Sequence, residues 1–499
     1  MTTKGAPIYA ITPSRATSPD PLYSNWSHVG AIQWTGIAPQ RDTSPRTNLA
    51  GEPTSSPDSF QYPYLLAARL QQLCGAVTAK AVEDTLFYRD ARLVSLNEVG
   101  GTPERFGMST GEFHQRAAAR GRDWPATMVA LSTHDTKRSE DVRARITVLS
   151  QCADRWAQRV RRWNTVCLPP DEATGLFLWQ NIIGVWPVSG DVDEVVRERL
   201  HGYAEKAIRE AELHTDWEQP DREFEGAVRD WIDALLDGPV ANEVTAFVGQ
   251  LDEAARCDAV AQKLLALTVP GIPDVYQGTE LFDDSLVDPD NRRPVDFALR
   301  QTELTALRRA EPGTPSHPKI RVVAAALRSR RERPTTYLSG DYTPVVADGP
   351  AADHVIAFQR GTDVLVVVPR WTLTLDESAC ADTVIALPDG DWTDRLTGRT
   401  WSGTVTADAL LAWERAPAAR VAHPAEDHLV PLMVAVGAAV VVALHVVERP
   451  SAARSGLFDA FVGEMPPGAE WPPAPPPARC QPPPPPPAAR CRPRSRWLW

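Results

Sequence analysis

A His-Asp pair, His134 and Asp135, stands between an apolar run and a highly charged segment in the stretch LSTHDTKRSEDVRAR, residues 131–145. A carboxylate in this setting could orient the hydroxyls of a bound sugar. Chemistry on a glycosidic bond, however, needs two more groups, an acid and a nucleophile. What this pair can do therefore depends on the partners that the rest of the chain supplies.

The composition is that of a globular protein with several domains. The chain has 499 residues, of which 43% are hydrophobic, and this length accommodates roughly two to four domains. The net charge of -12 and the pI near 5.4 give no general attraction to phosphate backbones or anionic lipid, so we expect no nucleic-acid partner. Sixteen tryptophans suggest a protein that faces sugars, although a single tryptophan more often anchors a core.

The cysteines and the apolar stretches exclude further classes. Seven cysteines are scattered without a Cys-x-x-Cys pair, so the sequence indicates neither a zinc site nor a disulfide framework. We expect no metal and no cofactor. Residues 1–21 lack the apolar core of a signal peptide. The longest uncharged stretch, 429–444, is short for a membrane span and contains Pro431 and Gly437. We therefore expect a cytoplasmic protein without a membrane partner.

The sequence pattern divides the chain into five stretches. Residues 1–60 are rich in Ser, Thr and Pro and predict irregular structure, and residues 466–499 contain a run of six prolines and predict a disordered tail. From 61 to 300, helical segments alternate with short apolar runs, as in βα units. Residues 301–410 predict a linker helix and an antiparallel β domain, and residues 411–465 are rich in Ala and Val.

Two predicted strands of the 61–300 region end in polar loops. One strand, in ALSTHDTKR, ends at Thr133, His134 and Asp135. The other covers Asp274–Tyr276 in LTVPGIPDVYQGTEL and ends in a loop with a glycine turn. Loops at the C-terminal ends of strands carry the chemistry of β/α barrels, so we expect both loops at the site.

The predicted β domain contains two hairpin signatures. Arg360-Gly361 separates the apolar runs of HVIAFQRGTDVLVVVPR, and Asp389-Gly390 interrupts DTVIALPDGDWTDRLTG. Both dipeptides favour the tight turns that connect neighbouring antiparallel strands.

Five segments together resemble one known family. They are AKAVEDTLFYRDARLVSLNEVGG, WPATMVALSTHDTKRSEDVRAR, LFLWQNIIGVWP, REAELHTDWEQPDREFE and LTVPGIPDVYQGTELFDDSLVDPDNRRPVDF. In this order, over roughly 61–410, they are similar to the maltooligosyltrehalose synthases, intramolecular transglucosylases of the α-amylase superfamily (glycoside hydrolase family 13). The resemblance implies an α/β fold: part of a (β/α)8 barrel of the α-amylase type over 61–300, followed by the antiparallel β domain.

The resemblance also implies a reaction. Such enzymes convert the reducing-end α-1,4 bond of a maltooligosaccharide into an α,α-1,1 bond, with retention, in trehalose biosynthesis. A nucleophilic Asp and an acid-base Glu would carry it, with their carboxyl groups about 5–5.5 Å apart. Asp135 matches the third catalytic carboxylate, and His134 matches a hydroxyl ligand beside it, unless His134 is a hydrogen-bonded rim residue.

Further residues match positions near the sugar. Lys80, Glu83 and Asp84 match a segment at the reducing-end glucose, with a plain helix terminus as the alternative. Lys137 and Arg138 could hold Asp135 or a substrate oxygen, or could pair with the acidic residues that follow. The remaining candidates are Tyr276, Gln277 and Glu280 on the last barrel loop, Arg292 and Arg293 as salt bridges that close the barrel, and Trp124 and Trp186 as stacking platforms.

The two other catalytic carboxylates have no counterpart. The family nucleophile lies in a strand of the type Gly-x-Arg-x-Asp-His and its acid in a later strand that ends in Glu, and neither segment occurs here. About half of the barrel is then missing, so we expect no activity from the chain alone. Two hypotheses remain: a partner chain supplies the absent strands, or the chain is a non-catalytic carbohydrate-binding protein.

A second resemblance covers about fifty residues of 411–465. ERAPAARVAHPAEDHLVPLMVAVGAA and SGLFDAFVGE resemble the C-terminal end of a class-III extradiol dioxygenase, with His423 and His428 in its motif. A metal-dependent dioxygenase is therefore a third hypothesis. An iron site needs further converging ligands, usually two His and a carboxylate, and these have no counterpart here.

Overall fold

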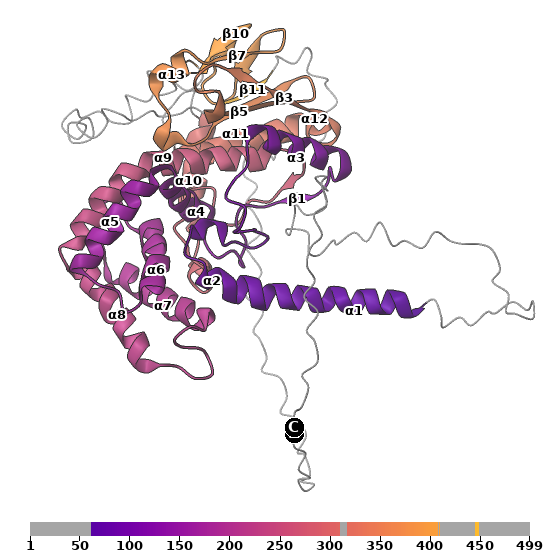
Figure 1. The fold of residues 1–499 in the computed structure, drawn as a ribbon. Coiled ribbons are helices and arrows are strands. Elements are labelled where there is room, and N and C mark those ends of the chain that lie inside the picture. Colours follow the sequence, from indigo (N-terminus) through magenta and orange to yellow (C-terminus); the bar gives the residue numbers. More distant parts are fainter. Residues whose placement is uncertain (1–60, 310–316, 408, 410–444, 449–499) are drawn as a thin grey trace, which may run out of the picture. The chain divides into compact units, whose positions relative to one another are not determined.

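The computed structural model describes residues 61–309, 317–407, 409 and 445–448, the coloured parts of Figure 1. Several predictions fall outside these residues: the irregular segment 1–60, most of 411–465 with His423 and His428, and the tail 466–499. No described helix is both long enough and apolar enough to cross a membrane.

Helices make up most of residues 61–340. The α-helices are α1 Gln61–Val77, α2 Phe87–Arg89, α3 Thr110–Asp123, α4 Glu140–Val148, α5 Ala153–Val166, α6 Glu172–Val185, α7 Glu194–Ala211, α8 Arg222–Asp237, α9 Val240–Thr268, α10 Phe297–Arg309, α11 Pro318–Glu332, α12 Pro334–Ser339 and α13 Glu377–Ala381. Thr78–Leu86 is a π-helical segment, and short 3-10 turns cover Val94–Leu96, Leu149–Cys152, Asp290–Arg292, Ala352–His354 and Thr372–Thr374. Polar side chains cap the N-termini of α3, α4, α6, α7 and α8; these are Ser109, Ser139, Asp171, Asp193 and Asp221. Such caps satisfy amide groups that the first helical turn leaves open, so the local sequence specifies these helix starts.

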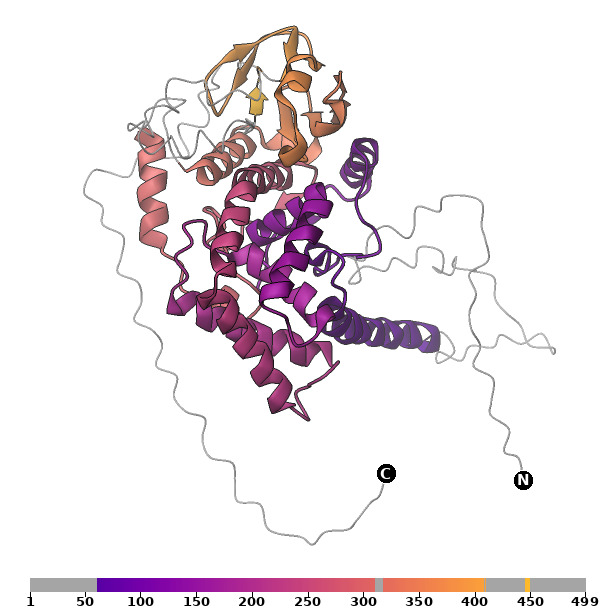
Figure 2. The same ribbon diagram turned by 60° about the vertical axis from the view of Figure 1, so that its left-hand side comes forward.

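The described strands form three sheets. They are β1 Met128–Val129, β2 Ile272–Pro273, β3 Tyr342–Val345, β4 Ala347–Asp348, β5 Val355–Arg360, β6 Val364–Pro369, β7 Val384–Ala386, β8 Trp392–Asp394, β9 Thr400–Trp401, β10 Thr404–Thr406 and β11 His445–Glu448. β1 and β2 pair in parallel. The antiparallel sheets have the orders β10-β7-β4 and β3-β5-β6-β11-β8-β9. In Figure 2, β11 is the yellow arrow among the orange strands.

The βα rhythm predicted for residues 61–300 is only partly present. β1 and β2 are the parallel strands of the described residues, and helices form most of the remainder. The apolar run RLVSLNEVG forms a 3-10 turn instead of a strand, because Val94 is buried and its amide donates to Gln180 Oε1 of α6 at 2.9 Å. The partial barrel therefore stays a prediction.

The strand predicted at Asp274–Tyr276 was wrong by two residues. β2 is Ile272–Pro273, and its pairing with β1 ends where the Asp274 amide donates to the Val129 carbonyl at 2.8 Å. The chain then turns, and the Thr279 amide donates to the Tyr276 carbonyl at 3.0 Å.

The antiparallel β character predicted for residues after about 335 is confirmed. β5 and β6 form the hairpin expected at Arg360-Gly361, and Gly361 has a φ of +53°, which favours glycine. The hairpin expected at Asp389-Gly390 was wrong, because the flanking strands β7 and β8 belong to different sheets. The turn there passes the chain from one sheet to the other.

Several tryptophans of the described residues are core anchors. Trp163 and Trp179 are fully buried, with ring centroids 5.1 Å apart, in the core shared by α4 to α9. Trp186, expected as a sugar-stacking platform, is 1% exposed, and its indole donates to Thr245 Oγ1. That expectation was wrong, because the ring packs inside the helical core; Trp124 is partly exposed.

Candidate functional site

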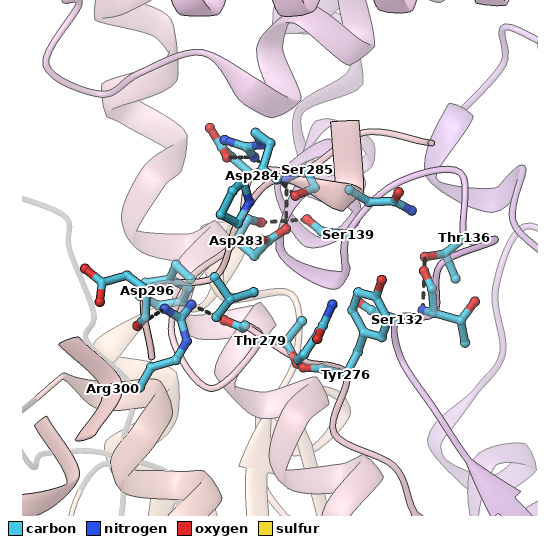
Figure 3. A pocket seen from close by; sticks show the side chains of 18 residues that line it. Ser132, Thr136, Ser139, Tyr276, Thr279, Asp283, Asp284, Ser285, Asp296 and Arg300 are labelled. Atoms are coloured by element: carbon cyan, nitrogen blue, oxygen red, sulfur yellow. Dashed lines mark hydrogen bonds and ion pairs between the residues drawn. The ribbon is translucent and has the colours of Figure 1, made fainter. Parts of the chain in front are cut away.

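A polar cavity of 260 Å³ lies between two loops. The first loop, residues 130–139, follows β1, and the second loop, residues 274–286, follows β2. Most lining residues carry hydroxyl, amide or charged groups; they are Ser132, Thr133, Thr136, Ser139, Tyr276, Gln277, Gly278, Thr279, Phe282, Asp283, Asp284, Ser285, Asn291, Arg293, Pro294, Val295, Asp296 and Arg300. Figure 3 shows these side chains around the cavity.

Parallel pairing explains why the two loops meet. Since the C-terminal ends of parallel strands lie at the same edge, β1 and β2 deliver both loops to one side. Ser139 then joins them: its amide donates to the Ser285 carbonyl at 2.8 Å, and its hydroxyl donates to the Asp283 carbonyl at 2.6 Å. The same hydroxyl accepts from the Val142 amide as the N-cap of α4, so the helix start is fixed to the second loop.

His134 and Asp135 lie at the open edge of the first loop. Their side chains are 66% and 73% exposed, and His134 Nε2 is 3.4 Å from Asp135 Oδ2. The Asp135 amide donates to Thr133 Oγ1 at 3.2 Å, and Asn291 of the cavity lining donates to the His134 carbonyl at 2.8 Å. The carboxylate thus points to solvent from a backbone held beside the cavity.

Asp84 links two of the predicted cationic residues. Its carboxylate is 2.5 Å from Lys80 Nζ and 2.9 Å from Lys137 Nζ. Burial raises the pKa of Asp84, but the hydrogen bonds from both lysines outweigh burial and lower it overall. Glu83 accepts from the Gly100 amide at 3.3 Å. Lys80, Asp84 and Lys137 therefore form one group, in which Lys80 is largely exposed and Lys137 is buried.

Arg138 lies inside the protein. Its guanidinium donates to Asn181 Oδ1, to the Asn97 carbonyl and to the Tyr203 hydroxyl, at 2.5, 3.2 and 3.2 Å. The side chain is 1% exposed, so a sugar contact would require the core to open. We therefore describe Arg138 as a core hydrogen-bond donor, which corrects its expected place among the substrate contacts.

The remaining candidates lie on the second loop and on the segment that follows it. Tyr276 and Gln277 line the cavity, and Glu280 pairs with Arg300 at 3.2 Å. Arg293 pairs with Asp284 and Asp290, and Arg292 pairs with Asp288, which are the salt bridges expected for this arginine pair.

Sequence reasoning missed a cluster of four buried charges: Glu140, Asp141, Lys263 and Lys319. Lys263 Nζ is 2.6 Å and Lys319 Nζ 2.8 Å from Glu140 Oε1, and Lys319 Nζ is 2.6 Å from Asp141 Oδ2. Burial raises the pKa of Asp141 to about 6. For Glu140, burial acts in the same direction, but the two ammonium groups outweigh it and lower its pKa. A single lysine within the apolar helix segment VAQKLLALT was the available signal, because a buried lysine needs an anionic partner.

The arrangement is suited to binding a polyhydroxylated molecule. Hydroxyls and amides of both loops can exchange hydrogen bonds with sugar hydroxyls, whereas His134 and Asp135 are not among the lining residues and present their side chains to solvent on the first loop. Glycosidic bond chemistry would need a nucleophile and an acid in addition. No group of three or more His, Cys, Asp or Glu suited to a metal occurs within the described part of the chain.

Known proteins resemble this chain over most of its length. No protein-family model matches it. Two curated Mycobacterium tuberculosis proteins, from strains CDC 1551 and H37Rv, each named "Putative maltooligosyl trehalose synthase", are 61% identical over 346 residues, which is 69% of this chain and 44% of theirs. The chain thus spans less than half the length of these relatives.

Solved structures agree with this similarity. A maltooligosyltrehalose synthase from Arthrobacter ramosus matches with a TM-score of 0.66 and 36% identity, over 77% of this chain and 46% of that one. A hypothetical maltooligosyl trehalose synthase from Sulfolobus tokodaii matches with a TM-score of 0.57 and 33% identity, over 67% and 45%. The fold described above therefore corresponds to just under half of these proteins.

Proposed function

We propose that this chain forms one part of a maltooligosyltrehalose synthase and binds maltooligosaccharides at the cavity between its first and second loops. The observation that carries the proposal is the 61% identity over 346 residues to proteins of that name. The polar cavity beside Asp135 supports it. In this proposal β1 and β2 are neighbouring strands of an α-amylase-type barrel, and Asp135 is the third catalytic carboxylate.

The positions of four candidate residues support an assignment of substrate contacts. Tyr276 lines the cavity, His134 and Asp135 lie at its edge, and Lys80 is the exposed member of the group around Asp84. We assign to these residues the binding of sugar hydroxyls, and to Glu83 and Lys137 the support of the segment around them.

Conversion of the substrate needs more than this chain. Because segments matching the family nucleophile and acid do not occur in it, Asp135 would act only with carboxylates from another polypeptide. A partner chain with the absent barrel strands is one source. Without it, the chain would be a carbohydrate-binding protein, the second candidate function, which rests on the same cavity. We do not propose dioxygenase activity, since His423 and His428 lie outside the described residues.

Binding can be tested by ligand-observed NMR with maltopentaose. We expect saturation transfer from the wild-type chain with a dissociation constant in the millimolar range, because each sugar hydrogen bond contributes only about 0.5–1.5 kcal/mol net. Asp135→Ala should lose the transfer, whereas Asp230→Ala, an exposed carboxylate on α8, should retain it. Equal transfer in all three proteins, or none in any, would contradict the proposed site.

A further inference from the structure

The cluster of Glu140, Asp141, Lys263 and Lys319 connects both walls of the candidate cavity. Its members come from α4, α9 and α11, two are cationic and two anionic, and all are buried or nearly so. The proposed function leaves this cluster without a role. None of its four side chains lines the cavity, so any effect on a ligand must pass through other residues.

Lys263 reaches the second loop. Its ammonium is 2.6 Å from Glu140 Oε1 and donates to Thr279 Oγ1 at 3.1 Å. The Thr279 hydroxyl in turn donates to the Tyr276 carbonyl at 2.8 Å. Thr279 and Tyr276 both line the cavity, so one continuous series of contacts runs from the carboxylate of Glu140 to this wall.

Glu140 reaches the first loop. The Ser132 hydroxyl donates to Glu140 Oε2 at 3.1 Å and accepts from the Glu140 amide at 3.0 Å. Ser132 lines the cavity from the first loop, which also carries His134 and Asp135, whereas Tyr276 lines it from the second loop. A single carboxylate therefore holds the first loop with one oxygen and, through Lys263, the second loop with the other.

Asp141 adds a second connection. It accepts from the Asp283 amide at 2.8 Å and is bound by Lys319 Nζ at 2.6 Å. Separating the partners of such a buried pair would leave each charge uncompensated, which is strongly unfavourable. The side chains are therefore held in the paired geometry. The cluster thus fixes both loops to helices that do not belong to the cavity.

We infer that Lys263 is a positioning residue for the candidate sugar cavity: held by Glu140, it fixes Thr279 and the backbone of Tyr276 at a set distance from Ser132. Lys263 is 1% exposed and does not contact the ligand. The inference rests on the proposed function for the nature of the ligand, but not for the positioning itself. Its consequence is that ligand affinity depends on a residue that no ligand touches.

The test uses three variants of the full chain. Thr279→Val removes the acceptor on the cavity wall and leaves the Lys263–Glu140 pair intact. Lys263→Met removes the link between Glu140 and the second loop, and leaves Lys319 as the cationic partner of Glu140. Thr245→Val is the matched control, because the Thr245 hydroxyl also accepts from a buried donor, Trp186 Nε1 at 2.9 Å, and donates to a helix carbonyl, Ala241 at 3.0 Å, away from the cavity lining.

Backbone amide exchange, read by mass spectrometry, is the ligand-independent measurement. We expect Thr279→Val to accelerate exchange in residues 274–286 by about tenfold or more, because the variant loses the hydrogen bond from Lys263 Nζ and the one to the Tyr276 carbonyl, without faster exchange in α5 to α8. Lys263→Met should also accelerate exchange in 274–286. Thr245→Val should leave both loops unchanged. The inference would be overturned if residues 274–286 of Thr279→Val exchanged at the wild-type rate. It would also be overturned if Thr245→Val accelerated exchange in this loop equally.

A maltopentaose titration by NMR then separates the two proposals. Thr279→Val should weaken binding about tenfold although its side chain is 1% exposed, and Thr245→Val should bind as the wild type does. Undiminished affinity in Thr279→Val would count against positioning. If the wild type binds no sugar, the proposed function fails, while the exchange data still decide the role of Lys263. If Lys263→Met does not fold, Thr279→Val carries both measurements, since it keeps the ion pair.

Discussion

Asp258 on α9 is a buried carboxyl with neutral partners. It accepts from Thr372 Oγ1 at 2.9 Å and from Gln151 Nε2 at 3.1 Å. Burial raises its pKa from 3.8 to about 6, against the hydrogen bonds, which lower it. Between these two pH values the folded chain therefore retains a proton that the unfolded chain has lost, and stability falls as pH rises.

The first prediction concerns this proton. An asparagine at position 258 would have nearly the same side-chain shape as Asp258 but would not titrate. The free energy of unfolding of Asp258→Asn, relative to that of the wild type, should therefore rise between pH 4 and pH 7. The rise of this pKa from 3.8 to about 6 corresponds to a change of about 3 kcal/mol at most in the free energy of unfolding. Urea unfolding of both proteins at pH 4, 5, 6 and 7 measures the difference. A constant difference across this range would show that Asp258 does not titrate as described.

Residue-level predictions succeeded where the signal is local. The apolar run before His134 and Asp135 predicted a strand that ends at these two residues; a strand is present there, but β1 already ends at Val129, and both residues lie on the loop after it. The burial of Arg138 could not be predicted, because its acceptors Asn181 and Tyr203 are 43 and 65 residues away in sequence. From sequence alone a charged residue is predicted to be exposed, because its burial depends on polar partners that can be distant in the chain.

At the scale of elements, the C-terminal end of α9 is held by an arginine of α11. Arg330 Nε donates to the Leu267 carbonyl at 2.6 Å, and its Nη2 donates to the Gly271 carbonyl at 2.8 Å, directly before β2. A cation at a helix C-terminus satisfies open carbonyls and interacts favourably with the helix dipole.

The second prediction compares neighbouring arginines. Arg330→Met should lower the free energy of unfolding by about 2 kcal/mol, because buried carbonyls lose their donor. Arg331→Met, next in sequence and exposed, should stay within about 0.5 kcal/mol of the wild type. Chemical denaturation at pH 7 distinguishes them, and losses of similar size would contradict a capping role for Arg330.

The packing of α6 on α4 depends on a glycine. A Cβ at Gly184 would lie 2.8 Å from Val142 Cγ1 and 3.0 Å from Ile146 Cδ1, whereas one at Gly202 on α7 would meet nothing within 4 Å. The same substitution should therefore have opposite effects at the two helical positions.

The third prediction follows from this contrast. Gly184→Ala should destabilise the chain by about 1–3 kcal/mol through overpacking. Gly202→Ala should stabilise it by about 0.5–1 kcal/mol, because alanine is the better helix former. Thermal and urea unfolding of both variants test the signs; stabilisation by Gly184→Ala would mean that α4 and α6 can separate at little cost.

Elements themselves were predictable to the extent that their patterns are local. The helical segments predicted between 61 and 300 are present in α1, α4 and α5, with the 3-10 turn Leu149–Cys152 between α4 and α5. The βα pattern predicted more strands than the described residues contain. An apolar run such as RLVSLNEVG can be buried against a helix without pairing with another strand. Whether such a run pairs is decided by partners that periodicity does not reveal.

At the scale of the whole molecule, the chain corresponds to 44% of its curated relatives. The fourth prediction is that the purified single chain forms no maltooligosyltrehalose from maltopentaose, because Asp135 cannot replace both a nucleophile and an acid. Product analysis by chromatography against a protein-free control measures this. Product above the control that disappears in Asp135→Asn would show that the chain contains its own catalytic partners.

The 29 residues of α9 have a consequence for how the protein unfolds. The helix is about 44 Å long, and its first half packs in the core with Trp163 and Trp179, while its second half packs in the core with Tyr337 and Phe358 of the β region. If either core unfolds, half of α9 loses its packing partners and becomes exposed to solvent. The two halves should therefore melt as one cooperative unit, and the slowest amides to exchange should lie near Ala254–Asp258, where the cores meet.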